Sequence, residues 1–65
     1  MKIKCDKGVD ALFISFTEKK IVETSENKPG DIILDYDAAG SIVGIEVLNA
    51  SQKIDNPAII DYQEI

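Results

Sequence analysis

Apolar and polar residues alternate through most of the chain, which is the pattern of β-strands with two different faces. Residues 1–5 (MKIKC) alternate strictly, and residues 11–17 (ALFISFT) are rich in β-branched and aromatic side chains. The same period of two runs through residues 31–37 (DIILDYD) and 41–48 (SIVGIEVL). Residues 21–27 (IVETSEN) are more polar, which favours an edge strand. The pattern predicts four or five strands.

The connections between these segments are short, so we expect consecutive strands to pair side by side as an antiparallel β-meander. Asn49 or Ser51 can cap a short helical turn after the last strand, and Pro57 prevents a longer helix. The predicted fold is therefore mainly β, α+β at most, with one sheet in a domain of residues 1–54. For residues 55–65 a last strand, a helix and a tail docked on the sheet or at a dimer interface all remain open.

The two faces of the predicted sheet differ in composition. The candidate core lies on one face and consists of apolar residues at alternate positions: Ile3, Leu12, Ile14, Phe16, Ile32, Leu34, Tyr36, Val43, Ile45 and Val47. The other face carries four more apolar residues, Phe13, Ile33, Ile42 and Leu48. An apolar surface of this extent is too large to leave in water. We therefore expect those four residues to contact a second copy in a homodimer, or a small protein partner, unless the C-terminal segment covers them.

The stretch DYDAAGSIVGIE, residues 35–46, shares some features with an EF-hand calcium loop. Asp35, Asp37 and Glu46 stand at positions 1, 3 and 12 of that motif. Position 5 is Ala39, which has no side-chain oxygen, and neither flank has the pattern of a helix. A β-hairpin is the preferred interpretation, because it accounts for every feature of the stretch.

A hairpin turn fits residues 37–40 (DAAG). Gly40 suits a left-handed backbone conformation, and the Asp37 carboxylate can accept hydrogen bonds from backbone N–H groups of the turn. If Asp35 and Glu46 share a face of the paired strands, their like charges repel each other. A weakly bound cation at Asp35, Asp37 and Glu46 would relieve this repulsion, as would solvent, and it remains the alternative interpretation.

The composition excludes several classes of function. The chain has 65 residues and a net charge of −5, with no arginine and no histidine. An acidic surface without arginine argues against nucleic-acid binding, which requires clustered basic residues. No apolar run approaches the roughly 20 residues that span a membrane, and no secretory signal is visible. A single cysteine excludes an internal disulfide, and we expect a cytoplasmic protein.

Three residues that attract attention have ordinary structural explanations. We interpret Cys5 as a small buried residue of the first strand, because no activating base is visible. We expect Asp10 to stabilise a turn. Gly44, inside a strand, indicates packing space or a β-bulge. Without histidine, arginine or a glycine-rich phosphate loop, we expect no catalytic residues, no enzyme activity and no cofactor.

The segments MKIKCDKGVDALFISFT and DIILDYDAAGSIVGIEVLNAS resemble the small prokaryotic proteins grouped as domain-of-unknown-function family 2283. The resemblance covers residues 1 to about 54, with Cys5 and Phe13 in place of the family's usual aromatic residue and tyrosine. It implies no activity and transfers no catalytic residue. Some members of the family are thought to be encoded beside small toxin-like proteins, which implies an antitoxin-like or other partner-binding role.

Two hypotheses about function follow. The first is a non-catalytic protein-interaction module, whose acidic charge would speed its encounter with a basic partner. The second is a protein that binds a cation or a small ligand weakly through Asp35, Asp37 and Glu46.

Overall fold

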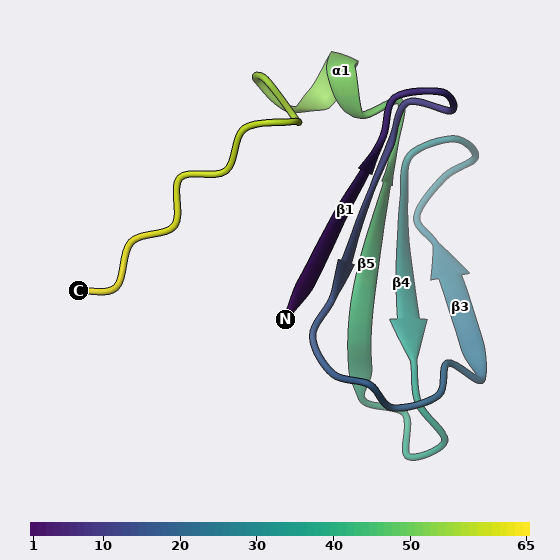
Figure 1. Ribbon diagram of the computed structural model, residues 1–65. Helices are drawn as coiled ribbons and strands as arrows, with labels where there is room; N and C mark the ends of the chain where they lie inside the picture. Colours follow the sequence, from purple (N-terminus) through teal and green to yellow (C-terminus); the bar gives the residue numbers. More distant parts are fainter.

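The computed structural model describes residues 1–65 and contains an open antiparallel sheet with a short helix at one end (Figure 1). The elements follow one another as β1 (Lys2–Asp6), β2 (Ala11–Ser15), β3 (Glu23–Glu26), β4 (Ile32–Tyr36), β5 (Ile42–Leu48) and α1 (Ala50–Lys53). The mainly β class is confirmed, and so is the position of the polar third strand at an edge. The chain has no helix with the length and apolar character needed to cross a membrane.

The strand order is β1-β2-β5-β4-β3, which differs from the predicted meander because β5 lies between β2 and β4. The segment that joins β2 to β3 runs around the end of the sheet to its far edge (Figure 1). Apolar pairing explains this order, since Leu12 of β2 lies opposite Val47 of β5. A meander would have put β3, with its sequence ETSE, inside the sheet, whereas all four of its residues are exposed at the edge.

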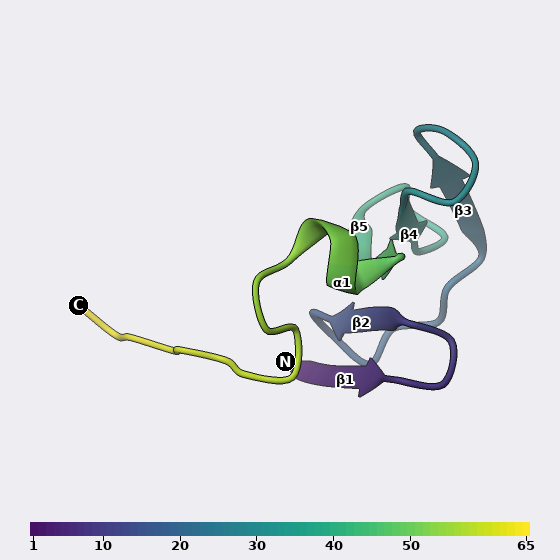
Figure 2. The same ribbon diagram turned by 90° about the horizontal axis from the view of Figure 1, so that it is seen from above.

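Each face of the sheet has its own set of side chains, as the pairing register shows. The helix-side face, on which α1 packs, carries Ile3, Cys5, Leu12, Ile14, Ile32, Leu34, Tyr36, Ile45 and Val47. The far face carries Lys2, Lys4, Ala11, Phe13, Ser15, Ile33, Asp35, Gly44, Glu46 and Leu48. Seen from above, α1 and the chain beyond it lie on one side of the sheet (Figure 2).

The core is small and sits where α1 meets the sheet. Leu12, Val47 and Ala50 form a buried cluster, and Ile54 packs against it. The predicted core was only partly right. Leu12, Val43 and Val47 are buried, while most of the other candidates are half-buried and Phe16 is 42% exposed. The reason is that α1 spans four residues and covers only one end of a five-stranded sheet. No large side chain is fully buried.

Asp10 caps α1 from a distant loop. Its Oδ1 accepts a hydrogen bond from the Ser51 N–H at 3.0 Å, its Oδ2 accepts one from the Ser51 hydroxyl at 2.7 Å, and its carbonyl accepts one from the Ala50 N–H at 2.9 Å. Asn49 occupies the N-cap position but makes no side-chain cap bond. The predicted caps, Asn49 and Ser51, are therefore replaced by Asp10, which the sequence analysis assigned to a turn.

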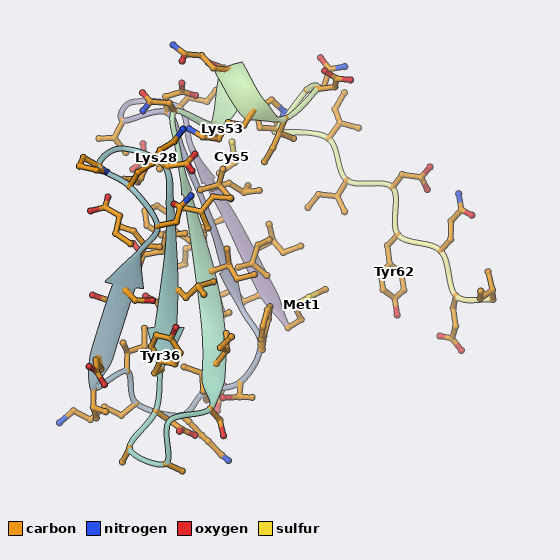
Figure 3. The ribbon with its side chains drawn as sticks, turned by 180° about the vertical axis from the view of Figure 1, so that it is seen from behind. Met1, Cys5, Lys28, Tyr36, Lys53 and Tyr62 are labelled. Carbon is orange, nitrogen blue, oxygen red and sulfur yellow. The ribbon has the colours of Figure 1, made fainter.

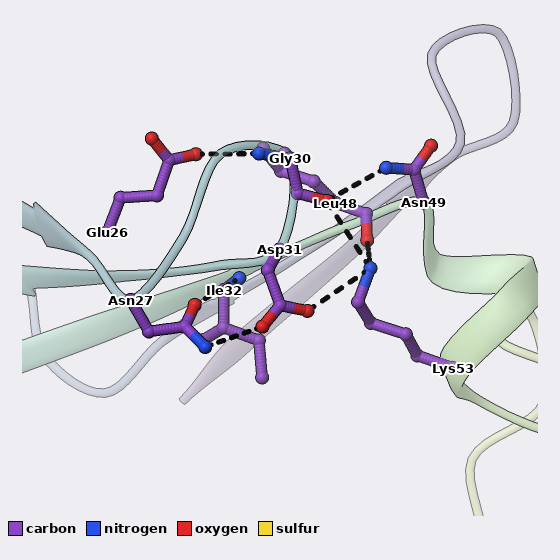
Figure 4. A network of polar contacts seen from close by, with 8 residues as sticks. All are labelled: Glu26, Asn27, Gly30, Asp31, Ile32, Leu48, Asn49 and Lys53. Atoms are coloured by element: carbon purple, nitrogen blue, oxygen red, sulfur yellow. Dashed lines mark hydrogen bonds and ion pairs between the residues drawn. The ribbon is translucent and has the colours of Figure 1, made fainter.

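A polar network ties the β3–β4 loop to α1 (Figure 4). Lys53 donates hydrogen bonds to the Leu48 and Gly30 carbonyls, and its ammonium lies 3.4 Å from the Asp31 carboxylate. Asn49 donates to the Gly30 carbonyl at 2.8 Å. On the other side, Asn27 hydrogen-bonds Asp31 and lowers the pKa of its carboxyl, with help from Lys53. The network holds the loop over the end of the sheet that α1 covers.

The C-terminal segment, residues 55–65, lies near its own sheet only at its start, where residues 57–59 and Cys5 line one hollow. After a turn near Asn56 it runs out in an extended form on the helix side (Figures 1 and 2). Figure 3 shows Tyr62 standing clear of the strands. Cys5, expected to be buried, is exposed, because β1 is an edge strand.

Candidate functional site

The predicted hairpin joins β4 to β5, and Asp37 belongs to its turn. Asp37 Oδ1 accepts hydrogen bonds from the N–H groups of Ala39 and Ser41, each at 2.9 Å. Gly40 has a φ of 83°, in the left-handed region expected for it. Both parts of the turn prediction are confirmed. Asp37 is buried, and its Oδ2 lies 4.0 Å from the Lys19 ammonium, so its carboxylate is already occupied.

Asp35 and Glu46 meet on the far face of the sheet. Asp35 lies opposite Gly44 and Glu46 opposite Ile33, so the two carboxyl groups are diagonal neighbours on β4 and β5. Asp35 is only 4% exposed, whereas Glu46 is half-buried. From the sequence, a cation or solvent was expected to relieve the repulsion between them. A proton on Glu46 relieves it as well, because the protonated carboxyl can donate to Asp35.

Hydrogen bonding to Asp35 raises the pKa of Glu46 to about 7, and burial and the charge of Asp35 act in the same direction. One carboxylate oxygen of the pair lacks a hydrogen-bond partner. Asp35 Oδ1 is buried and has no hydrogen-bond partner, although buried carboxylate oxygens ordinarily find one. Glu46 therefore takes up a proton as the pH falls below about 7, and Asp35 keeps one oxygen without a partner.

Gly44 makes room for the pair. A Cβ at this position would stand 2.8 Å from the backbone carbonyl oxygen of Ile14 and 3.2 Å from Asp35 Oδ2. The register also shifts between Asp35 and Tyr36, which marks a β-bulge beside the pair. Both predicted explanations of Gly44, packing space and a bulge, therefore apply, and the groups packed against it are the Ile14 carbonyl and Asp35.

A hollow of about 420 Å³ lies over the pair. Phe13 and Ile21 contribute apolar side chains, and Lys2, Lys4, Ser15, Asp35 and Glu46 contribute the polar part. Ile14 and Ile45 also border the hollow, but their side chains point to the helix-side face, so they reach it only through the backbone. Ile21 reaches it from the long β2–β3 connection. The hollow thus combines an apolar wall with an unsatisfied acidic acceptor, which suits a cationic or hydrogen-bond-donating group.

The three-carboxylate cation cluster considered from the sequence does not form. No group of three or more histidine, cysteine, aspartate or glutamate side chains converges anywhere in the chain. Asp37 is held in the turn, and only Asp35 and Glu46 come together. An EF-hand site is excluded as well, since strands and not helices flank residues 35–46.

The four residues predicted for a partner contact do not share one face. Phe13, Ile33 and Leu48 are half-buried on the far face, as expected. Ile42 lies opposite Tyr36 as a result of the bulge, and directly opposed residues share a face. Ile42 is therefore on the helix side and 45% exposed. Strict alternation predicted its side wrongly because the bulge shifts the register.

The helix-side face is the larger uncovered apolar surface. Below α1 its central strands present Ile14, Leu34, Ile45 and Tyr36, all half-buried. These residues were predicted to be core, and the contact surface was predicted on the opposite face. The short length of α1 leaves them open. Pro57, which prevents a longer helix, was the signal in the sequence that the cover after the last strand is short.

No curated protein and no solved structure matches the chain. A family profile with the description "Protein of unknown function (DUF2283)" matches residues 2–51, which include every strand and the start of α1. The resemblance seen in the sequence is confirmed. The chain belongs to this family of unknown function.

Proposed function

We propose that this protein is a non-catalytic protein-interaction module, and that a second copy of the chain covers its helix-side face in the working form. The observation that carries the proposal is the unfinished core, since no large side chain is fully buried. A small domain has little stability to spare, and apolar burial is its main source. A partner that covers Ile14, Leu34 and Ile45 would complete the core.

A second copy suits this face better than a polar partner would. The exposed centre of the face is apolar, and homodimer interfaces are the most apolar class of protein contact. Two copies related by a twofold axis would place this face against itself, which is the simplest way to hide an identical apolar surface on each chain. The net charge of −5 is spread over other parts of the chain, mainly turns, β3 and the C-terminal segment.

Sedimentation velocity at micromolar concentration tests the proposal. We expect the wild-type chain to sediment as a dimer. Leu34→Lys, on the helix-side face, should give a monomer, whereas Ile33→Lys, next to it on the far face, should remain dimeric. Leu34→Thr introduces a polar β-branched residue that suits a strand, and it serves as a second variant if the lysine prevents folding. A wild-type monomer, or equal disruption by both lysine variants, would refute the proposal.

A small basic protein is the alternative occupant of the interface. The family resemblance implied an antitoxin-like role, and the acidic charge of this chain would speed encounter with such a partner. This version predicts a stable wild-type monomer that forms a heterodimer with the basic protein, so the sedimentation experiment separates it from self-association.

Cation binding by Asp35 and Glu46 is a second candidate function. Its support is the free Oδ1 of Asp35, which is buried under the hollow of the far face and has no partner. A hydrated Mg²⁺ ion needs only one or two carboxylates, and the Ser15 hydroxyl lines the same hollow. Bound metal would also neutralise the two carboxylates.

Isothermal titration with Mg²⁺, Ca²⁺ and Mn²⁺ tests this candidate. We expect heat of binding from the wild-type chain and none from Asp35→Asn, because Asp35 supplies the free oxygen. Asp37→Asn is the matched control and should bind like the wild type, since Asp37 stays in the turn. Absence of heat from the wild type below millimolar metal would remove the candidate.

A further inference from the structure

The C-terminal segment has the character of an interface element that lacks its partner. Four of its large apolar side chains are strongly exposed: Ile59 at 72%, Ile60 at 57%, Tyr62 at 73% and Ile65 at 116%. From residue 60 onward, no backbone group forms a hydrogen bond with another backbone group. An extended strand with unpaired N–H and C=O groups and apolar side chains is ready to add to a sheet edge.

The direction of the segment points to a second chain. It leaves α1 on the helix side of the sheet and runs away from its own strands (Figures 1 and 2). A copy that covers the helix-side face would stand on this same side. The segment of one chain would therefore meet the body of the other.

Charge distinguishes the two sheet edges. The C-terminal segment carries Asp55, Asp61 and Glu64 and no lysine. The edge strand β3 has the sequence ETSE, so its two glutamates would repel the segment. The other edge strand, β1, has the sequence KIKCD and offers Lys2 and Lys4. Opposite charges on neighbouring strands stabilise pairing, and like charges oppose it.

Length and side-chain alternation also fit β1. Residues 59–65 in extended form span about 23 Å, more than the roughly 17 Å of a five-residue strand such as β1. Within the segment Ile60 and Tyr62 point to one side and Asp61 to the other. If Asp61 faces the lysines on the far face, Ile60 and Tyr62 lie on the helix side beside Ile3 and Cys5.

We propose that the C-terminal segment of each chain pairs with the β1 edge of a second copy and extends that sheet by one strand. The contact would cover both β1 edges and bury the apolar residues of both segments. This inference rests on the proposed self-association and specifies which segment and which edge take part in it.

Cysteine cross-linking tests the proposal, because Cys5 is the only cysteine and lies exposed on β1. The wild-type chain supplies the edge thiol, and a second chain with Cys5→Ser and Tyr62→Cys supplies the tail thiol. After the two chains are mixed and oxidised with diamide, we expect a disulfide-linked heterodimer as the main product. Ile60→Cys should behave like Tyr62→Cys, whereas Asp61→Cys should give several-fold less product, since it faces the other side.

A matched control moves the edge thiol to the acidic edge. A chain with Cys5→Ser and Ser25→Cys carries its cysteine on β3, and it should form little heterodimer with the Tyr62→Cys chain. Equal yields from β1 and β3 would overturn the proposal. So would an internal disulfide in one dilute chain that keeps Cys5 and carries Tyr62→Cys, because the segment would then pair with its own sheet.

Sedimentation of a chain ending at Pro57 separates this inference from the proposed function. If the wild type is a dimer and the shortened chain dimerises as tightly, the helix-side face associates without the segment and the inference fails alone. If the wild type is a monomer, both fail. We expect the shortened chain to dimerise at least about tenfold more weakly, because it loses the added strand and its apolar contacts.

Discussion

Asp35 and Glu46 lie diagonally across β4 and β5 on the far face of the sheet, and hydrogen bonding to Asp35 raises the pKa of Glu46. Gly44 supplies the space, because its missing side chain lets Asp35 approach β5. The arrangement therefore couples backbone packing to the protonation of Glu46. Its behaviour should depend on pH near neutrality.

Replacing Glu46 should make this dependence visible. The folded state raises the pKa of Glu46 from 4.5 to about 7, so between these values it holds a proton that the unfolded chain has lost. The free energy of unfolding should therefore fall as pH rises from 4.5 to about 7. Glu46→Gln keeps a hydrogen-bond donor without the charge. It should stabilise the protein by about 1 kcal/mol at pH 8, since solvent screens this half-buried group.

Urea unfolding at pH 5 and pH 8 measures the effect of Glu46→Gln. The gain should be larger at pH 8 than at pH 5. Glu23→Gln, which removes an exposed carboxylate on β3, is the control and should show no such difference. Equal stability changes for Glu46→Gln at both pH values would contradict the raised pKa of Glu46.

Gly44→Ala should destabilise the protein through a steric clash. The added Cβ would stand 2.8 Å from the Ile14 carbonyl oxygen, a backbone atom that cannot rotate away. We expect a loss of about 2 kcal/mol, typical of an overpacked interior. Asp35→Ala in the same chain should not restore stability, because the backbone contact is the tighter one. Full rescue by that second change would show that Asp35 alone sets the need for glycine.

Substitutions of Asp10 should separate its two roles. Asp10 caps α1 and also has a φ of 55°, a conformation that asparagine and glycine tolerate. Asp10→Asn keeps an acceptor for the Ser51 N–H and should be close to wild type. Asp10→Gly loses both side-chain hydrogen bonds to Ser51 and should cost about 1 kcal/mol. Thermal unfolding measures both variants, and equal losses would argue against capping.

The sequence predicted local structure well, because alternation and turn chemistry act over a few residues. The β4–β5 hairpin, with Asp37 and Gly40 in the turn, follows from such rules. The strand order does not, since it depends on which strand finds the better apolar partner across the sheet. Leu12 pairs with Val47 of β5 and not with a residue of β3, and no local pattern indicates that choice.

The candidate site was partly visible for the same reason. Their spacing in the sequence indicated Asp35 and Glu46 as candidate site residues. Repulsion between them was expected if they shared a face of the sheet. The burial of Asp35 and the raised pKa of Glu46 depend on Gly44 and on the neighbouring β2 backbone. The Asp10 cap joins residues 41 positions apart in the chain, which short-range rules do not detect. The side of Ile42 was missed because a bulge interrupts the alternation.

Substitutions of Asp37 should show whether this residue acts in the turn or as a metal ligand. Its Oδ1 accepts two backbone N–H groups, and Asp37→Ala would leave both without a partner. We expect a loss of about 2 kcal/mol by urea unfolding, while Asp37→Asn keeps the Oδ1 acceptor and should lose much less. If Asp37 were a metal ligand, magnesium would stabilise the wild type more than Asp37→Asn. The geometry predicts the same magnesium effect on both chains, because in the structure the turn alone occupies this oxygen.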